Sequence, residues 1–394
     1  MDRPVPASFW RGGTSRGVLF SADDIAGYDG GQIDAIILAA LGSPDPDGRQ
    51  IDGLGGGSSS LSKAAIVGAP PPESPADVAY RFAQVEVAEP FVDFTGNCGN
   101  ISAAIGPFAV DNGLIEPGDG STDVVVLSAN TGQLCRARVP TRRGRYEPAG
   151  DFAIQGVPGT GSRIAMTYID PGGSIGRGPL PTGAPCEQIG TGDGRSVIAS
   201  IVDVANPAVF VRAEEMGAAA SAPAGVLDTD HDLQARLEHM RCEAAVRIGL
   251  AASLDEAARQ PTIPKVAMVG PAASYGASSG KQVTAESIDL VVRLISMRRT
   301  HRTVALTGAM ALAGAAALPG TVVADVVSGG AVGDRTLRIG HPAGVIEIGV
   351  TAEGGPGDGW RFPAVTVDRT AREIMRGSVL VPESHLAGRA WYQE

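Results

Sequence analysis

The sequences NCGNISAAIGPFAVDNG (97–113) and VALTGAMALAGAAALPG (304–320) decide the fold. In each stretch, apolar and small residues follow a helical spacing, and a turn signal closes the run, Asn112-Gly113 in the first and Pro319-Gly320 in the second. We therefore predict helices over 97–112 and 304–318. A helix that is apolar on every side must be buried, so we expect each one at the centre of a core.

Strand-like runs surround both helices. In the first half they cover 4–10, 18–20 and 78–87 and dominate 124–167; in the second half they cover 197–204, 208–212, 265–269, 287–296, 321–327, 335–339 and 345–350. Residues 32–42 and 231–250 have the spacing of two further helices. The pattern predicts an α+β protein in which two sheets each wrap around a central buried helix.

Length and glycine content favour two domains. The chain has 394 residues, more than one hydrophobic core usually supports. Glycine occupies 54 positions and proline 28, which favours short strands joined by tight turns over a helical bundle. The expected junction is the Gly/Pro-rich stretch 171–185.

Charge and cysteine spacing exclude several classes of protein. The net charge of −11 weighs against a nucleic-acid partner but is compatible with an anionic small molecule, because helix ends and a few arginines act locally. Cys98, Cys135, Cys186 and Cys242 are far apart and form no CxxC pair, so we expect neither a metal site nor a disulfide framework. Without a membrane-length apolar run or a signal-peptide core, the sequence predicts a soluble cytoplasmic protein.

Cys98 is the sharpest catalytic candidate, because it lies where the helix 97–112 begins. The first N–H groups of a helix lack intrahelical partners and carry partial positive charge. Such an end lowers the pKa of a thiol and attracts carboxylates. Cys98 would then act as a thiolate base or a thiol acid beside an anionic substrate. The alternative is a small buried cysteine that only packs at a helix start.

Lys63 is the second candidate. It follows the loop GGGSSSLS (55–62) and leads into the apolar run Ala64–Val67. The loop is not a P-loop, because Ser62 and Ala64 replace the required residues, but its amides and hydroxyls could bind a carboxylate. A partly desolvated lysine has a lowered pKa and can serve as a base. The alternative is an exposed lysine in a flexible loop.

Two further segments offer anion-binding groups. The turn GGTSRG (12–17) presents amides and hydroxyls, and either Arg11 or Arg16 could clamp a carboxylate; the alternative is a plain hairpin turn. In the second half, Thr307-Gly308 opens a helix as Cys98-Gly99 does. The residues before it could add positive charge for a di- or tricarboxylate, or form a solvated basic run: Arg293, Ser296, Arg298, Arg299 and His301.

These motifs, taken in order, resemble those of the 2-methylaconitate cis-trans isomerase family, which includes 4-oxalomesaconate tautomerases. The resemblance rests on GGTSRG (12–17), GGGSSSLSKAAIV (55–67), GNCGN (96–100), DPGGS with a following PTG (170–183), VDVANPAVFV (202–211), RLISM (293–297) with His301, and TGA…AAALPGTVV (307–323). It spans essentially the whole chain, and several motifs in order are far more specific than any one of them.

The resemblance implies the diaminopimelate epimerase fold, with two similar domains, 1–185 completed by 378–394 and 186–377, and an active site in the cleft between them. It implies catalysis by Lys63 and Cys98 without a cofactor or metal. The implied substrate-binding residues are Thr14, Ser15, Arg16, Ser58, Ser59, Ser60, Gly99, Asn100, Ser278, His301, Thr307 and Gly308. The expected partner is a small polycarboxylate, not nucleic acid or a membrane, and a homodimer is the protein assembly to consider.

The chain departs from the family pattern at one substrate-facing segment. Where the family reads SMGK followed by a His-His-Ala-like segment, this chain has SMRRTHRT (296–303), which keeps His301 but lacks the second histidine. Thr307 also stands where diaminopimelate epimerases have a second cysteine. This disfavours a two-thiol racemase.

We therefore expect an isomerase that moves a proton and a C=C bond in an unsaturated di- or tricarboxylate, such as oxalomesaconate or methylaconitate. Two alternatives remain at this point. An amino-acid racemase or epimerase would need an acidic group for the substrate ammonium, and the motifs contain no clear acidic cluster. A non-catalytic polycarboxylate-binding protein would keep the anion loops without needing Lys63 or Cys98 to titrate.

Overall fold

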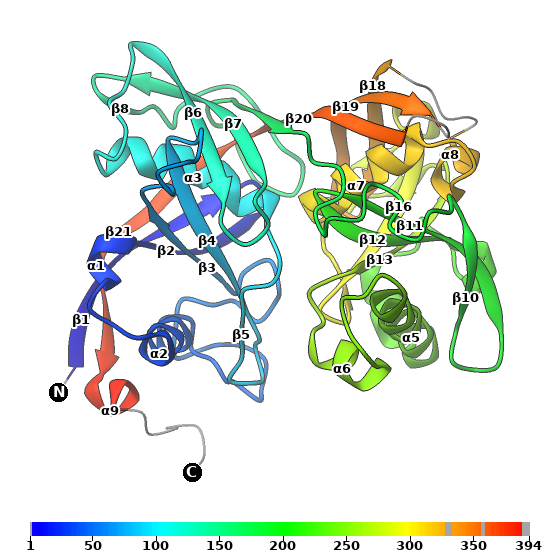
Figure 1. Ribbon diagram of the computed structural model, residues 1–394, viewed down its shortest axis with the longest axis horizontal. Coiled ribbons are helices and arrows are strands. Elements are labelled where there is room, and N and C mark those ends of the chain that lie inside the picture. The colour runs from blue at the N-terminus through cyan, green and yellow to red at the C-terminus, as the bar shows by residue number, and fades with distance from the viewer. Residues whose placement is uncertain (1, 328–332, 356–358, 388–394) are drawn as a thin grey trace. The chain divides into compact units, whose positions relative to one another are not determined.

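The computed structural model describes residues 2–327, 333–355 and 359–387. The chain divides into two compact units (Figure 1): unit 1 contains Met1–Met166 and Asp368–Glu394, and unit 2 contains Thr167–Val367. The chain passes from one unit to the other within strand β9 (Ile164–Ile169) and again within β20 (Gly359–Arg369). The divisions thus fall earlier than residues 185 and 377, because regular strands, and not the Gly/Pro-rich loop, carry the chain across.

Unit 1 is a sheet wrapped around helix α3 (Gly99–Asp111), whose residues are buried from Gly99 to Val110. β1 pairs antiparallel with β2 and β21, β2 runs parallel to β3, β3 pairs antiparallel with β4, and β4 runs parallel to β6. The strands are β1 (Asp2–Gly12), β2 (Ser15–Ser21), β3 (Lys63–Gly68), β4 (Val78–Val85), β5 (Val92–Asp93), β6 (Gly120–Ser128), β7 (Leu134–Arg142), β8 (Arg145–Tyr146) and β21 (Ala371–Pro382). The other helices are α1 (Ala22–Ile25), α2 (Gly30–Leu41) and α9 (Glu383–Leu386).

Unit 2 is built around helix α7 (Leu306–Ala317), which is buried along its length and packs on β11, β12, β18 and β19. Its strands are β10 (Glu187–Gly190), β11 (Ser196–Val204), β12 (Asn206–Arg212), β13 (Lys265–Pro271), β14 (Tyr275–Gly276), β15 (Gln282–Val283), β16 (Leu290–Ser296), β17 (Arg299–Thr300), β18 (Gly333–His341) and β19 (Gly344–Gly355). Its other α-helices are α4 (Ala224–Thr229), α5 (His231–Arg247), α6 (Leu254–Arg259) and α8 (Val322–Val326).

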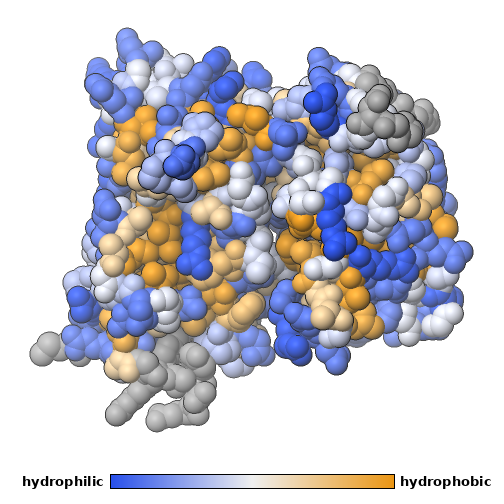
Figure 2. Space-filling view, viewed as in Figure 1, coloured by the Kyte–Doolittle hydropathy of each residue, from blue (hydrophilic) through white to orange (hydrophobic). Residues whose placement is uncertain are grey.

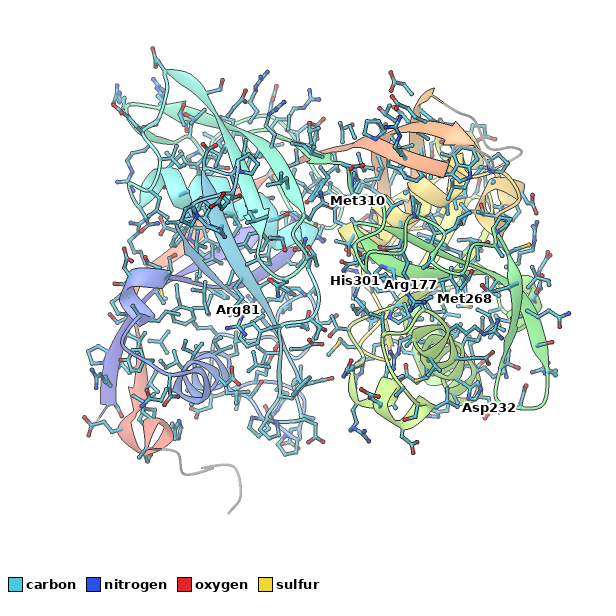
Figure 3. All side chains as sticks on the ribbon, viewed as in Figure 1. Arg81, Arg177, Asp232, Met268, His301 and Met310 are labelled. Atoms are coloured by element: carbon cyan, nitrogen blue, oxygen red, sulfur yellow. The ribbon has the colours of Figure 1, made fainter. Side chains whose placement is uncertain are left out.

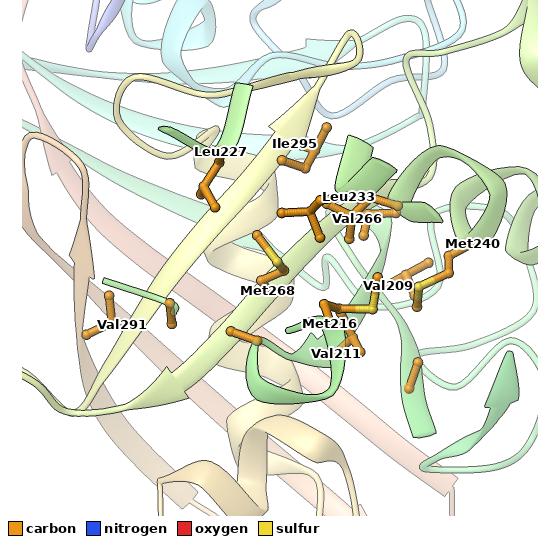
Figure 4. Close-up of a cluster of buried hydrophobic side chains, with 14 of the residues drawn as sticks. Val209, Val211, Met216, Leu227, Leu233, Met240, Val266, Met268, Val291 and Ile295 are labelled. Carbon is orange, nitrogen blue, oxygen red and sulfur yellow. The ribbon is translucent and has the colours of Figure 1, made fainter. Parts of the chain in front are cut away.

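A second apolar layer in unit 2 joins α5 to the sheet. Leu233 and Met240 of α5 belong to one buried cluster with Val209, Val266 and Met268 of the strands (Figure 4). At about 25 cal/mol per Å² of buried apolar surface, such clusters supply most of the stabilisation of a sheet and its covering helix. The cluster makes the sheet a rigid support for the residues at its strand ends.

Both units repeat one strand order. β3 begins at Lys63 and runs parallel to β2 with Val18 opposite Ala64, and β13 begins at Lys265 and runs parallel to β12 with Ala208 opposite Lys265. In both units this strand pairs antiparallel with the next one, β4 or β16, which in turn runs parallel to β6 or β18. The repeat therefore places a lysine at the first position of the corresponding strand in each unit.

The structure confirms the two buried helices and corrects one predicted strand. Residues 321–327 contain helix α8, because the Thr321 hydroxyl accepts a hydrogen bond from the Ala324 N–H (3.1 Å) and caps a helix that the β-branched run alone would not favour. Residue 287, the first of the predicted strand 287–296, lies at the end of a short 3₁₀ helix (Ala285–Ser287), and strand β16 begins at Leu290. Strands β20 and β21 were not predicted.

The exposed large apolar side chains are scattered over both units. They include Ile51, Phe91, Ile198, Val226 and Leu380. On the face shown in Figure 2, hydrophilic residues interrupt the apolar areas. Within the described ranges, none of the helices has the length and apolar character needed to cross a bilayer.

Candidate active site

Lys63 is buried at the start of β3, with 6% of its surface exposed. The apolar run Ala64–Val67 continues into the sheet and carries the lysine inward with it. The Lys63 amine lies 5.1 Å from the centre of the Phe82 ring and donates a hydrogen bond to the Gln84 side-chain oxygen. The expected partial burial is thus complete, and the alternative of an exposed loop lysine does not apply.

The Gly/Ser loop before Lys63 is held by a buried glutamine, Gln50. Its side-chain oxygen accepts hydrogen bonds from the N–H groups of Gly56 and Gly57 (3.0 Å each), and its nitrogen donates to the hydroxyls of Ser43 (2.8 Å) and Ser62 (2.7 Å). Three of these bonds hold the two ends of the serine run, at Gly56 and Gly57 before it and at Ser62 after it, and the fourth connects the glutamine to Ser43. The loop is therefore an ordered cradle and not a flexible linker.

Cys98 is half-buried and occupies the N-cap position of α3. Among the described residues, its side chain makes no capping hydrogen bond to the helix. Its N–H donates to the Asn97 side-chain oxygen (2.7 Å), which also accepts a hydrogen bond from the buried Tyr80 hydroxyl. Burial raises the pKa of Tyr80, so this hydroxyl stays protonated as a donor. Tyr80 and Asn97 thus fix the backbone that carries the thiol.

The turn GGTSRG docks against the start of α3, and only glycine fits at its contact points. A Cβ atom at Gly12 would lie 2.4 Å from the Asn100 carbonyl oxygen, and one at Gly13 would lie 2.3 Å from the Asn100 side-chain oxygen. The Thr14 N–H donates to that same side-chain oxygen at 3.4 Å. Close backbone approach is the physical reason for the paired glycines. It brings Thr14 and Ser15 beside the helix start.

Ser15 and Arg16 carry buried polar atoms that point to an anionic ligand. The Ser15 hydroxyl and the Arg16 Nε atom have no hydrogen-bond partner among the described residues, although Ser15 is only 2% exposed. Arg16 also contacts the Gly/Ser loop. Its backbone N–H donates to the Ser60 carbonyl (3.0 Å), and its guanidinium lies against Gly56. A buried unpaired donor is costly, and a carboxylate would satisfy both groups.

Lys63 and Cys98 are close enough to affect each other electrostatically. Burial lowers the pKa of Lys63, and the negative charge that Cys98 carries as a thiolate acts in the opposite direction and raises it. Burial is the larger effect, so the neutral amine is favoured at lower pH than in water. Unit 1 therefore contains the amine, the thiol, a helix start and two segments that the sequence predicts to bind anions, the turn 12–17 and the loop 55–62.

Unit 2 has its own buried polar cluster near the start of α7. The Asn206 amide donates to the Thr307 hydroxyl (3.5 Å), and a Cβ atom at Gly308 would lie 2.2 Å from Leu294 and 3.9 Å from the Lys265 side chain. His301 is 7% exposed (Figure 3), and its Nδ1 atom accepts from the Thr303 N–H at 3.2 Å. The predicted residues Thr307 and Gly308 thus lie in the first turn of α7, and His301 lies on the segment that leads into this helix.

Ser278 is placed differently from these residues. It is exposed in the turn between β14 and β15, and its N–H donates to the Pro342 carbonyl (2.8 Å). The Ser278 hydroxyl belongs to that turn and not to the buried cluster at α7.

The basic run before α7 serves the fold more than a ligand. Arg293 is buried, and its guanidinium donates to the carbonyls of Ala222 (2.7 Å), Val292 (2.8 Å) and Ser221 (2.9 Å). Burial lowers the pKa of Arg293 to about 10. Arg298 donates to the Ala258 carbonyl at 2.6 Å. Arg293 is therefore not part of a solvated basic run, and backbone carbonyls hold the guanidinium groups of both arginines.

Four site residues escaped the sequence analysis: Gln50, Tyr80, Gln84 and Asn97. Gln84 follows Val78, Tyr80 and Phe82 on one face of β4, and a polar residue in such a buried series was the available signal. Among the described residues, His, Cys, Asp and Glu side chains form no cluster of three or more that could hold a metal ion.

Comparison with known proteins gives one consistent result. The family described as PrpF protein matches residues 2–382. The 2-methyl-aconitate isomerase of Cupriavidus necator is 38% identical over 96% of this chain and 97% of its own length. The 3-methylitaconate isomerase of Eubacterium barkeri is 39% identical, covering 97% and 98%, and the 4-oxalomesaconate tautomerase of Pseudomonas putida is 34% identical, covering 96% of both chains.

Solved structures agree with the sequence relatives. The crystal structure of a methylitaconate-delta-isomerase superposes with a TM-score of 0.76 at 39% identity, covering 99% of this chain and 98% of that one. A hydroxyproline epimerase from Agrobacterium vitis shares the fold alone, with a TM-score of 0.51 at 13% identity, 96% of this chain and 93% of that chain. The expected α+β fold of the diaminopimelate epimerase type is confirmed. With matching motifs, fold and length, the chain belongs to the PrpF protein family.

Proposed function

We propose that this chain is a cofactor-independent isomerase that moves a proton and a C=C bond in an unsaturated di- or tricarboxylate. The observation that carries the proposal is the buried Lys63 amine, with its lowered pKa, in electrostatic contact with Cys98. Names of full-length relatives, which include a methyl-aconitate isomerase, a methylitaconate isomerase and an oxalomesaconate tautomerase, support the substrate class.

The reaction needs one group that accepts a proton and one that donates a proton. In one direction, the neutral Lys63 amine takes an allylic C–H proton, the C–H electron pair forms a new C=C bond, and charge moves onto the conjugated carboxylate. The Cys98 thiol then protonates the far carbon, and one proton passes from the ammonium to the thiolate to restore both groups. The reverse assignment, with Cys98 as base, balances equally well. General acid–base groups typically contribute about 10²–10⁴-fold.

The surrounding donors stabilise the negative charge that forms in the transition state. The start of α3 provides a positive dipole end beside Cys98, and the Ser15 hydroxyl and Arg16 guanidinium are available to a carboxylate. Ser58, Ser59 and Ser60 lie in the loop that Gln50 orders. Donors placed before the reaction begins stabilise an enolate-like charge at little reorganisation cost.

The first test is an activity screen. Purified protein should be incubated with a panel of unsaturated di- and tricarboxylates while ultraviolet absorbance is followed, because moving a conjugated double bond changes that signal. Lys63→Met and Cys98→Ala should each lower turnover by about 10²-fold or more and keep the wild-type circular dichroism. Activity near the wild-type level in both variants would refute the assignment.

Proton transfer predicts exchange with solvent. During turnover in heavy water, the product and recovered substrate should carry deuterium at the allylic carbon, measured by mass spectrometry and proton NMR. Turnover without deuterium in either compound would contradict an open two-group mechanism.

Protection of Cys98 from alkylation by a bound ligand tests whether the ligand binds beside this thiol and whether the thiol is needed for turnover. Cys186 is exposed, whereas Cys135 and Cys242 are buried, so a Cys186→Ser background leaves Cys98 as the accessible thiol. Iodoacetamide should inactivate this protein, and a saturated tricarboxylate should slow the inactivation. If the alkylated protein still binds the tricarboxylate tightly and keeps full activity, a group other than Cys98 is catalytic. If the protein binds the ligand but turns over no substrate, it is a binding protein.

A further inference from the structure

Gln84 lies directly opposite Lys63 in the antiparallel pair β3–β4. It is 4% exposed, and its side-chain oxygen accepts the hydrogen bond from the Lys63 amine. Directly opposed residues on neighbouring strands interact through their side chains on the same face of the sheet. Gln84 is therefore part of the immediate surroundings of the amine.

The orientation of the Gln84 amide is set by the loop behind it. Its nitrogen donates to the carbonyls of Ser62 (2.9 Å) and Ser59 (3.2 Å). A carbonyl only accepts hydrogen bonds, so the NH₂ end must face the loop and the oxygen must face Lys63. Since Ser62 is also bonded to Gln50 (2.7 Å), the lysine, the glutamine and the Gly/Ser loop form one connected network.

We propose that Gln84 is a positioning residue that holds the Lys63 amine toward the substrate with a neutral acceptor. An uncharged amine can donate one N–H to Gln84 and keep its lone pair free to take a proton. A carboxylate at the same place would stabilise the ammonium form instead, because an opposite charge within about 4–6 Å raises the pKa of a lysine, typically by 1–3 units. Glutamine thus orients the amine without protonating it.

Other charged or titratable groups near Lys63 come from each neighbouring element. Cys98 at the start of α3 acts on it directly. Asp93 of β5 lies opposite Gln84 and accepts from the N–H (2.7 Å) and hydroxyl (2.6 Å) of Thr95. Tyr80 shares β4, and Arg16 belongs to the neighbouring β2. All of these groups are kept in the variants below, so a change at residue 84 reports on Gln84 alone.

The test compares Gln84→Glu with Gln84→Met. Its first readout is enzyme activity, and this readout rests on the proposed function. In Gln84→Glu, the acid limb of the kcat/KM profile should move to higher pH by about 1–3 units, with activity recovering in alkaline buffer. In Gln84→Met, kcat should fall about 10-fold or more, because a misplaced group loses rate steeply, while the limb stays in place or moves to lower pH. Gln188→Glu adds the same charge at an exposed position of β10 and should leave the profile unchanged.

A second readout does not depend on activity. The chain contains three lysines, Lys63, Lys265 and Lys281, so a protein labelled with ¹³C at the lysine side chains gives a simple NMR titration, and Lys63→Met assigns one signal. The Lys63 signal should titrate at higher pH in Gln84→Glu than in the wild type. An unchanged Lys63 titration in folded Gln84→Glu would overturn the proposal.

The NMR titration and the activity profile test two different claims, the contact between Gln84 and Lys63 and the role of Lys63 as the base. If Lys63 titrates as expected but the pH profile does not follow it, the positioning contact is real and Lys63 is not the base of the reaction. If Gln84→Glu does not fold, Gln84→Met still decides, since wild-type kcat in that variant would show that the amine needs no acceptor at residue 84.

Discussion

Lys63 carries a basic group at a place where the folded protein solvates charge poorly. Burial lowers its pKa, and nearby Cys98 partly offsets that effect. Only the neutral amine can accept a proton, and burial favours this form. The same burial makes the charged form of Lys63 unfavourable and so lowers the stability of the folded protein where the lysine is protonated. For Lys63, the proposed function and the stability of the fold therefore make opposite demands on the same side chain.

Replacing Lys63 by methionine should change how stability depends on pH. The unfolded chain holds a proton at Lys63 up to near the ordinary value of 10.5, whereas the folded chain releases it at lower pH. Unfolding therefore takes up a proton in that window, and the wild type gains stability as pH rises through it. In urea unfolding measured at a series of pH values up to about 10, the free energy of unfolding of the wild type should rise relative to that of Lys63→Met; a constant difference would contradict this.

Asp203 should show the opposite dependence. It is fully buried and accepts from the Ser174 hydroxyl (2.6 Å) and the Ile175 N–H (2.9 Å), and burial raises its pKa to about 6. The folded state then holds a proton that the unfolded state has lost above 3.8, so stability falls as pH rises from about 4 to 6. The difference corresponds to roughly 3 kcal/mol.

Asp203→Asn removes this titration. Over the same pH range, the variant should gain stability relative to the wild type in thermal or urea unfolding. Asp255→Asn, at an exposed position of α6, is the matched control and should track the wild type. Parallel curves for Asp203→Asn and the wild type would disprove the assignment.

At the scale of elements, the site depends on backbones that approach each other closely. β2 and β3 run parallel, and a Cβ atom at Gly17 would lie 2.6 Å from the Lys63 carbonyl oxygen. The glycine therefore lets the strand that begins with Lys63 pack against the turn that carries Ser15 and Arg16. This contact, together with the loops, brings the proposed catalytic lysine close to the turn that is proposed to bind anions.

Gly17→Ala should separate these strands. We expect a loss of about 1–3 kcal/mol in the free energy of unfolding, typical of an overpacked core, and a larger loss of turnover than of stability, because Lys63 moves. Gly27→Ala is the control, since a Cβ atom there would meet no described atom within 4 Å. Equal behaviour of the two variants would show that the contact is not constraining.

The sequence predicted the elements whose signal is local. The apolar stretches at α3 and α7 left no face for water, and Lys63 before an apolar strand pointed to burial. Gln84 was missed because its role depends on pairing with a residue 21 positions away. The strand predicted at 321–327 was wrong because the Thr321 cap outweighed β-branched propensity. β21 escaped because most of its residues are exposed or half-buried, which weakens the alternation.

At the scale of the whole molecule, unit 1 is assembled from both ends of the chain. β21 pairs with β1 from Asp2 opposite Pro382 to Gly12 opposite Ala371. Tyr146 also donates to the Ala371 carbonyl at 2.9 Å. The C-terminal strand thus completes the sheet that surrounds α3, while unit 2 is a single continuous segment.

A chain that ends after Val367 should lose unit 1 and keep unit 2. Without β21, β1 loses the hydrogen bonds along one of its edges, and α3 loses the packing contacts that β21 makes with it. Amide hydrogen exchange should show unprotected amides in 2–166 and protected amides in β11–β13. A chain that ends after Leu386 keeps β21 and α9 and is the control. Protected amides in unit 1 of the shorter chain would contradict the prediction.

The split construction of unit 1 has a consequence for biosynthesis. Translation is vectorial and domains generally fold as they emerge, so the segment 167–367 can fold on the ribosome while the earlier segment still waits for its last strand. The unit that contains Lys63 and Cys98 is therefore completed only after β21 has been synthesised. Chains that terminate before β21 would therefore lack the last strand of the unit that carries the proposed catalytic pair.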